Sequence, residues 1–305
     1  LTMNLRDLKY ICAVADLKHF GRAAEYCNIS QPTLSGQIKK LENELGVTLF
    51  ERNYKVIRVT EIGEKVVSLA RQANLAADQI NKVAIAAQDP LSGSISIGLI
   101  PTIAPYLIPL FAKKLRKSMT KMTIRYVEDI TDRLVDNIIH GKLDMAVLAT
   151  SPIEETLTSI ELFSEPFWLL YPKNHPLSKI NDIQMEDVDQ EDLLLLAEGH
   201  CFRDQALSIC KSPQSTQQQF LQATSLETLI NLVISGQGIT LIPALAIRNK
   251  WNSKSEIIKT KINEKSAQRK VYLTFRKEFS RLQIIDALTE IIRNSLPETV
   301  ATSCS

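Results

Sequence analysis

An apolar heptad repeat is the feature that most constrains how this chain can fold. From residue 62 the apolar positions step alternately by four and three, at Ile62, Val66, Leu69, Ala73, Ala76, Ile80, Val83 and Ala87. This spacing predicts one helix of about 28 residues, roughly 42 Å long. Such a seam pairs with a second helix, so we predict a dimerisation face from Ile62 to Val83. A long helix that packs along its own domain is the alternative interpretation.

The residues before the seam have the pattern of a small helical DNA-binding domain. Ser30 is a good N-cap and Gly46 a good terminator, which predicts a helix between them. One face of that helix is apolar, and the other mixes hydroxyls, lysines and a glycine, which suits contact with phosphates and base edges. The basic turn within "LFERNYKVIRVTEIG" predicts a wing. Candidate DNA contacts, for which an ordinary solvated face is the alternative, are Gln31, Pro32, Thr33, Ser35, Lys39, Lys40, Arg52 and Lys55.

Composition narrows the class of protein. The 305 residues are 45% hydrophobic and 23% charged, with a net charge of +2, as in globular proteins. No long run of uncharged apolar residues is present, so no membrane span is predicted. The chain starts with charged residues and without the apolar core of a signal peptide, so we expect a cytosolic protein. The four histidines are far apart in sequence, and we expect no metal and no other cofactor.

Beyond a hinge-like "QDPLSG", apolar strands alternate with amphipathic helices, which predicts open α/β sheets. "SISIGLIPTIAPYLIPLFAKKLRK" is typical of strand, turn and helix, and "FWLLYP", "EDLLLLAEG" and "GITLIPALA" predict further strands. Thr224 and Glu227 have the spacing of a capping box for another helix. Ligands in such folds lie at the carboxyl ends of strands, which places "IPTIAP" on one wall of a site.

Cys201 and Cys210 are nine residues apart, a spacing that fits neither a CxxC redox motif nor a zinc site. The segment between them predicts a helix that begins at Cys201 and separates the thiols by about 13.5 Å along its axis. A disulfide needs Cα atoms within roughly 7 Å, so helix and disulfide are mutually exclusive. The helix N-terminus, His200 and Arg203 favour a thiolate, whereas Asp204 opposes it. From spacing alone, a redox pair and two unrelated half-buried thiols both stay open.

The stretch "FGRAAEYCNISQPTLSGQIKKLENELGVTLFERN", followed by "VTEIG", resembles the winged helix-turn-helix of LysR-type transcriptional regulators, and the match covers residues 4–88. The resemblance implies an α+β protein with a winged helix-turn-helix at 3–60, a linker helix at 61–88 and a hinge at 89–93. It also implies a two-subdomain α/β effector domain like periplasmic binding proteins. Subdomain I would comprise 94–164 and 268–305, and subdomain II 165–267, with crossings near Ser164 and Ala267.

Further stretches, among them "GHCFRDQALSIC" and "ATSLETL", are similar to the peroxide-sensing members of that family. This similarity implies that hydrogen peroxide oxidises Cys201 and that Cys210 resolves the sulfenate to a disulfide. It also implies a peroxide pocket formed by Thr102, Thr131, His200, Arg203 and Asp204. For the two threonines, capping of the helices that follow them is the alternative.

The expected function is a peroxide-sensing transcriptional regulator, an activator of antioxidant genes, and not an enzyme. The implied partners are operator DNA, other copies of the chain in a homodimer and homotetramer, RNA polymerase, and glutaredoxin or thioredoxin as reductant, with no membrane. A LysR-type regulator that responds to a small organic ligand, with incidental cysteines, is the main alternative. A thiol peroxidase is another, but it leaves the basic helix and the heptad seam without a role.

Overall fold

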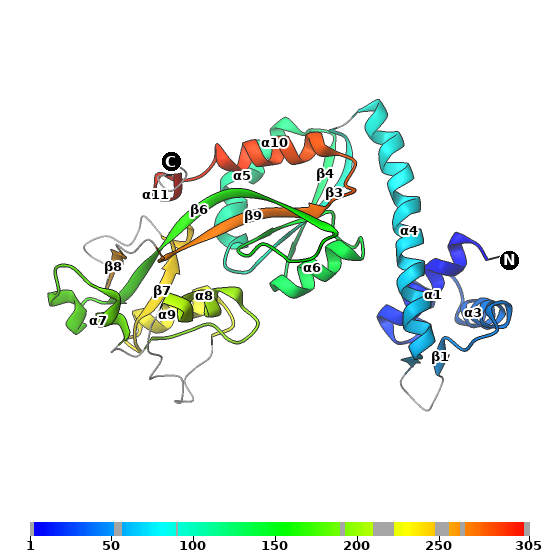
Figure 1. Cartoon of the computed structure of the whole chain (residues 1–305), viewed down its shortest axis with the longest axis horizontal. Coiled ribbons are helices and arrows are strands. Elements are labelled where there is room, and N and C mark those ends of the chain that lie inside the picture. Colours follow the sequence, from blue (N-terminus) through cyan, green and yellow to red (C-terminus); the bar gives the residue numbers. More distant parts are fainter. Residues whose placement is uncertain are drawn as a thin grey trace. The chain divides into compact units, whose positions relative to one another are not determined.

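The chain folds into two compact units, Leu1–Gln88 and Asp89–Ser305 (Figure 1). The computed structural model describes residues 3–51, 57–89, 91–189, 193–209, 223–247, 256–262 and 266–301. The boundary between the units falls at the end of the long helix that carries the heptad repeat.

The smaller unit combines three packed helices, a short hairpin and one long helix. Its elements are α1 (Leu5–Leu17), α2 (Phe20–Tyr26), α3 (Gln31–Leu45), β1 (Phe50–Glu51), β2 (Arg58–Val59) and α4 (Glu61–Gln88). The predicted ends of α3 are confirmed, because the Ser30 hydroxyl accepts a hydrogen bond from the Thr33 amide at 3.3 Å and Gly46 ends the helix with a φ of 69°. β1 and β2 pair antiparallel, as a wing requires. Arg52 and Lys55 lie outside the described residues.

α4 packs on its own domain along one face and leaves much of its heptad seam exposed. Val67 and Ala70 are buried in the core shared with α1, and Arg71 Nη2 forms an ion pair with Asp16 Oδ1 at 2.6 Å. Of the heptad positions, Leu69 is 65% and Ile80 71% exposed, and Ile62 and Ala76 are also exposed, whereas Val66 and Ala73 are half-buried and pack against that same core. The side chain of Val83 lies outside the described part. Neither α4 nor any other described helix is long and apolar enough to cross a membrane.

The first half of the larger unit is a parallel sheet with helices on both faces. Its strands β3 (Gly93–Leu99), β4 (Met122–Glu128) and β5 (Met145–Leu148) lie in the order β4-β3-β5 and are connected by α5 (Ala104–Ser118) and α6 (Thr131–Ile139). α5 and α10 (Leu282–Arg293) lie on one face of the sheet and α6 on the other (Figure 1). Because β3 and β4 are parallel neighbours, with Leu99 opposite Glu128, the turns that follow them meet at one edge.

Two long antiparallel strands connect this half to the second half. β6 (Leu157–Pro172) pairs with β9 (Gln268–Arg276) as far as Pro166 opposite Gln268, and the two strands run side by side in Figure 1. Beyond Pro166, β6 pairs instead with β7 (Thr240–Pro243) and β8 (Ile257–Lys261). A separate hydrophobic core lies on each side of this change of partner. Ser164 and Ala267, the expected crossing residues, lie close to it.

The second half contains mostly short elements: η1 (Pro176–Lys179), α7 (Met185–Asp189), α8 (Cys201–Ile209), α9 (Leu226–Ile234) and η3 (Ala244–Ala246), while α11 (Glu298–Ala301) follows α10. The predicted helix start at Cys201 is confirmed. Two predictions here are wrong. Ser225 and not Thr224 caps α9, because the Ser225 hydroxyl accepts from the Thr228 amide at 3.2 Å. The described residues of "EDLLLLAEG" form only isolated bridges, at Leu193 and Leu196, and no regular strand.

Candidate functional site

Two threonines lie just beyond the ends of neighbouring parallel strands. Thr102 follows β3 and Thr131 follows β4, so the register of the two strands brings both to the same edge of the sheet. Neither threonine occupies a helix N-cap position. Ile103 is the residue that precedes α5, and Ile130 the one that precedes α6. The capping interpretation is therefore wrong for both.

Thr102 is held by an arginine from the crossing strand β9. The threonine is only 2% exposed. Arg269 donates from Nη1 to the Thr102 hydroxyl at 2.9 Å and from Nη2 to the Thr102 carbonyl oxygen at 3.2 Å. The guanidinium also forms a buried ion pair with Glu165 of β6 and lies 5.4 Å from the ring centre of Phe202. Arg269 thus links Thr102 to Glu165, so that the threonine is connected to both crossing strands.

Thr131 contributes a buried hydroxyl that has no hydrogen-bond partner in the described part of the chain. Buried hydroxyls nearly always have a partner, so an unpaired one marks a place where water or a ligand binds. Thr131 is the first residue of α6, and a helix N-terminus favours negative charge. This hydroxyl is therefore available to a small polar molecule at the edge of the sheet.

Cys201 reaches the same place from the second half of the unit. The turn before it has a φ of 89° at Gly199, which glycine adopts without steric cost. Cys201 is the first residue of α8, and its half-buried side chain packs against the core of the first half. The next residue, Phe202, is buried in the second core against Phe167, with ring centres 5.4 Å apart. The thiol therefore lies between the two halves, at the N-terminal end of α8.

Residues from both halves line a small, half-open cavity beside this thiol. It is lined by Ile100, Pro101, Thr102, Ile130, Thr131, Gly199, His200, Cys201 and Phe202. Its volume is about 10 Å³, which is close to the space that one water molecule needs. Burial lowers the pKa of His200 below its ordinary value of 6.5, so the imidazole is neutral at pH 7. The cavity thus has about the size of a water molecule and is lined by two threonines, a cysteine and a neutral histidine.

The remaining predicted pocket residues do not line this cavity. Arg203 donates from Nη1 to the carbonyl oxygen of Leu196 at 3.0 Å, and Asp204 is exposed. Cys210 lies outside the described residues. Sequence reasoning missed Arg269, which brings positive charge to the wall of the cavity. Its only sequence signal is a basic residue at the start of an apolar strand, and that signal does not say where the side chain points.

The two cysteines of the smaller unit lie in a different environment. Cys12 and Cys27 are half-buried and pack against the core of that unit. Asn74 of α4 donates from Nδ2 to the sulfur of Cys12 at 3.7 Å. Burial raises the pKa of Cys27, which keeps its thiol protonated and unreactive. Neither cysteine is among the residues that line the cavity.

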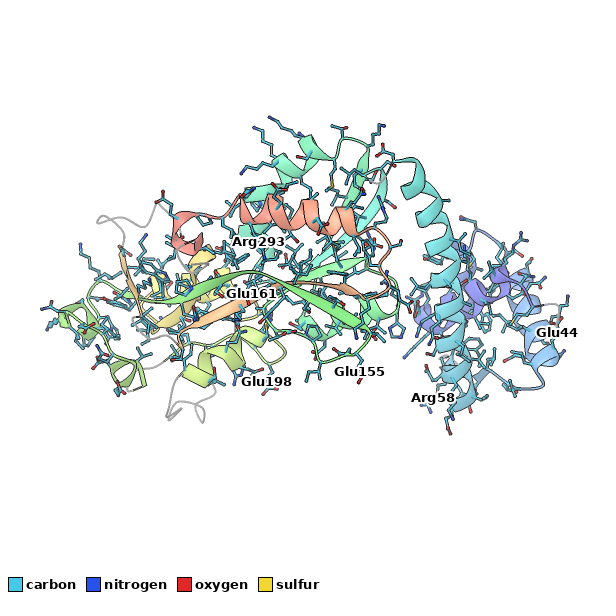
Figure 2. All side chains as sticks on the ribbon, turned by 45° about the horizontal axis from the view of Figure 1, so that its top comes forward. Glu44, Arg58, Glu155, Glu161, Glu198 and Arg293 are labelled. Atoms are coloured by element: carbon cyan, nitrogen blue, oxygen red, sulfur yellow. The ribbon has the colours of Figure 1, made fainter. Side chains whose placement is uncertain are left out.

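The face of α3 predicted to contact DNA is open in the smaller unit. The predicted contacts Gln31, Pro32, Thr33, Lys39 and Lys40 are exposed, and Ser35 is half-buried. The opposite face, with Leu34, Ile38 and Leu41, is buried. A Cβ added at Gly36 would meet no described atom within 4 Å. Arg58 on β2 is also exposed (Figure 2), so basic groups from the helix and the hairpin both face solvent.

Two family descriptions match the chain. "Bacterial regulatory helix-turn-helix protein, lysR family" matches residues 5–64, and "LysR substrate binding domain" matches residues 88–297. The chain belongs to the LysR family of bacterial transcriptional regulators. Its predicted fold and the DNA-binding role of its first unit are thereby confirmed, and the LysR family is one of regulators and not of enzymes.

Its relatives within the LysR family include peroxide-inducible activators. The "Hydrogen peroxide-inducible genes activator" of Dickeya chrysanthemi and the "DNA-binding transcriptional dual regulator OxyR" of Escherichia coli K12 are each 42% identical over 245 residues, 80% of this chain and 80% of the relative. Full-length OxyR of Pseudomonas aeruginosa, a cysteine-to-aspartate variant, is 36% identical with a TM-score of 0.79 and covers 96% of this chain and 99% of its own. A cysteine-to-serine variant of Corynebacterium glutamicum OxyR with hydrogen peroxide bound is 31% identical, with a TM-score of 0.66 and coverages of 99% and 95%. This LysR regulator is an OxyR homologue.

Proposed function

We propose that hydrogen peroxide switches this LysR regulator by oxidising the thiol of Cys201. The observation that carries the proposal is that Cys201, Thr102 and Thr131 line one cavity of about 10 Å³. Hydrogen peroxide is one oxygen atom larger than water, and each of its oxygens both donates and accepts hydrogen bonds. The similarity to an OxyR that was solved with hydrogen peroxide bound supports the same conclusion.

The proposed first step is attack of the Cys201 thiolate on peroxide. The sulfur bonds to one oxygen, the O–O bond breaks, and the other oxygen leaves as hydroxide that takes up a proton to become water. The sulfur is oxidised to sulfenic acid and the peroxide is reduced. Arginine can only donate hydrogen bonds, so the Thr102 oxygen accepts from Arg269 and its own proton is left to donate elsewhere. A donor beside the leaving oxygen stabilises the negative charge that develops there.

Cys210 is the proposed partner in the second step. Its thiol attacks the sulfenic sulfur, a disulfide forms, and water leaves. This role comes from the sequence, because Cys210 lies outside the described residues. A helix over residues 201–210 would separate the two positions by about 13.5 Å, too far for a disulfide, so α8 unwinds when the bond forms. Because Cys201 packs against one core and Phe202 against the other, unwinding alters the contact between the two halves.

The oxidised protein would then act at promoters as a cytoplasmic activator of antioxidant genes. α3 binds operator DNA, while the heptad face of α4 pairs two copies, and two such pairs form the homotetramer that the family resemblance implies. A change in the effector unit shifts the spacing of the DNA-binding units and the recruitment of RNA polymerase. Glutaredoxin or thioredoxin returns the disulfide to two thiols.

A small organic effector is the main alternative, and the volume of the cavity argues against such a ligand beside Cys201. Pockets for such ligands usually measure about 300–1,000 Å³, far more than the space beside Cys201.

Thiol mapping combined with DNA footprinting tests the proposal. Reduced protein is treated with one equivalent of hydrogen peroxide, the thiols are mapped by mass spectrometry, and the same samples are footprinted on operator DNA. We expect a Cys201–Cys210 disulfide together with a changed footprint, and neither in Cys201→Ser. If both thiols stay free and the footprint is unchanged in the wild-type protein, the proposal is wrong.

A further inference from the structure

Glu165 is a fully buried carboxylate that the proposed chemistry leaves without a role. It lies on the crossing strand β6 and pairs with Arg269 on the crossing strand β9, and neither side chain has any exposure. Its Oε1 accepts from Arg269 Nε at 2.8 Å and lies 2.7 Å from Arg269 Nη2. Its Oε2 accepts from the amide of Leu245 at 2.8 Å. Both oxygens are thus engaged, and the carboxylate is fixed between two strands and the segment after β7.

The geometry of the pair determines which way the arginine points. Glu165 contacts the edge of the guanidinium formed by Nε and Nη2, which leaves Nη1 directed at the Thr102 hydroxyl at 2.9 Å. A guanidinium is a rigid planar fork, so fixing one edge fixes the other nitrogen as well. The ring of Phe202 beside the guanidinium adds a contact but no directional hydrogen bond. Glu165 therefore supplies the anchor that aims Arg269 at Thr102.

We propose that Glu165 is a positioning residue for the oxidation of Cys201, and this proposal rests on the function proposed above. It holds Arg269 so that the arginine occupies the Thr102 oxygen as an acceptor, and the Thr102 proton is then directed at the peroxide oxygen that leaves. The chain of contacts runs from Glu165 through Arg269 to Thr102, and only the last of these residues lines the cavity. Without the anchor, the guanidinium keeps only its two hydrogen bonds to Thr102, and the Thr102 proton is no longer aimed at the leaving oxygen.

The competing explanation is a purely structural ion pair that fastens the two crossing strands. It is separated from positioning by comparing two reactions of the same thiolate. Oxidation by hydrogen peroxide expels hydroxide, which needs a hydrogen-bond donor, whereas alkylation by iodoacetamide expels iodide, which does not. Loosening of the fold changes both rates, whereas loss of the donor slows oxidation alone.

The experiment measures both rates at Cys201 in the full-length reduced protein, at a pH where the thiol is ionised, for wild type, Glu165→Gln and Glu161→Gln. Glu161 is the matched control, since it also lies on β6 (Figure 2) and pairs with Lys270 of β9 at 2.9 Å, but in solvent. We expect Glu165→Gln to slow oxidation about ten-fold to a hundred-fold and to leave alkylation within about two-fold. Glu161→Gln should change neither rate.

A double-mutant cycle tests whether Glu165 acts through Thr102. Thr102→Val slows oxidation, and addition of Glu165→Gln to it should slow oxidation no further, since both changes remove the same donor. Equal slowing of oxidation and alkylation, unchanged oxidation in Glu165→Gln, or independent effects in the cycle would each overturn the proposal. If Glu165→Gln does not fold, Glu165→Asp takes its place. Oxidation and alkylation of Glu165→Asp at the wild-type rates would then contradict the proposal. If hydrogen peroxide does not oxidise Cys201 in the wild-type protein, the proposed function itself is wrong.

Discussion

At the scale of single residues, the unpaired hydroxyl of Thr131 gives a direct test of the cavity. An unsatisfied buried hydroxyl costs about 1–3 kcal/mol, and valine has nearly the same shape without that group. We expect Thr131→Val to leave the free energy of unfolding unchanged or to raise it by up to about 1 kcal/mol, while oxidation of Cys201 slows roughly ten-fold. Urea unfolding of the reduced protein and quenched oxidation measure the two effects.

Thr289 supplies the matched control for this substitution. Its hydroxyl is also buried without a partner among the described residues, but it belongs to α10 and does not line the cavity. Thr289→Val should have the same effect on unfolding and none on oxidation. Equal oxidation rates in the two variants would remove Thr131 from the site.

His200 predicts a dependence of stability on pH. Burial lowers its pKa below 6.5 in the folded protein, so the unfolded chain binds the proton more readily. Stability from this residue is complete above pH 6.5 and declines as pH falls toward the folded pKa, because there the unfolded state holds more protons. In urea unfolding from about pH 7.5 to about pH 5.5, wild type should lose stability relative to His200→Asn. A difference between the two proteins that is constant over this range would contradict the assignment.

The residues of the site differ in how far sequence could identify them. Cys201, Thr102 and Thr131 stand in short motifs at a helix start or after a strand, and the family resemblance implies their roles in the site. Arg269 acts on Thr102 across 167 residues of sequence, a contact that only the pairing of β6 with β9 creates. Arg203 was predicted beside the thiol from adjacency in sequence, yet its guanidinium turns to the backbone of Leu196.

At the scale of elements, α8 is the segment that the disulfide must unwind. Amide hydrogen exchange of residues 201–209 should rise after peroxide treatment, and α9, which is not part of the bridged segment, should keep its protection. In Cys210→Ser the sulfur can still be oxidised but no disulfide can form, so α8 should stay protected. Full protection of α8 in protein whose disulfide has been verified by mass would refute the unwinding.

α3 offers a second prediction at this scale, through two glycines with opposite roles. Gly36 lies inside the helix on the open face, so Gly36→Ala should stabilise the protein by about 0.5–1 kcal/mol and, if that face meets DNA, weaken operator binding. Gly46 has a φ of 69°, so Gly46→Ala should destabilise by about 1 kcal/mol. Thermal unfolding and fluorescence anisotropy with operator DNA measure both effects. Undiminished DNA affinity in Gly36→Ala would show that DNA does not approach this face closely.

Elements with strong local signals were predicted well, and those that depend on distant partners were not. The cap and terminator of α3 and the start of α8 come from residues inside the segment. The apolar run "EDLLLLAEG" has the composition of a strand, but its described residues only touch neighbours at isolated bridges, because apolar burial does not require a continuous ladder. The cap of α9 lies one residue later than predicted because Ser225 carries the same hydroxyl group as Thr224.

At the scale of the whole molecule, the heptad repeat of α4 predicts that the protein forms a dimer. α4 buries Val67 and Ala70 in its own domain, and Leu69 and Ile80, on its heptad face, remain largely exposed. Exposed leucine and isoleucine at heptad spacing are typical of a helix that pairs with another copy. Packing of α4 on its own domain therefore leaves heptad residues exposed that the predicted dimer would cover.

Leu69→Glu tests this dimer face in the full-length protein. Burial of one leucine contributes about 1.5–3 kcal/mol, and a two-fold dimer loses the contribution twice, so the dimer should weaken by at least about 100-fold. Gln72→Glu adds the same charge at an exposed position of α4 outside the heptad and should leave the dimer intact. Sedimentation equilibrium measures the association, and unfolding curves establish that both variants fold. If folded Leu69→Glu dimerises as wild type does, the dimer interface lies on the effector unit and not on α4. A segment other than α4 would then have to set the distance between the two α3 helices on the operator.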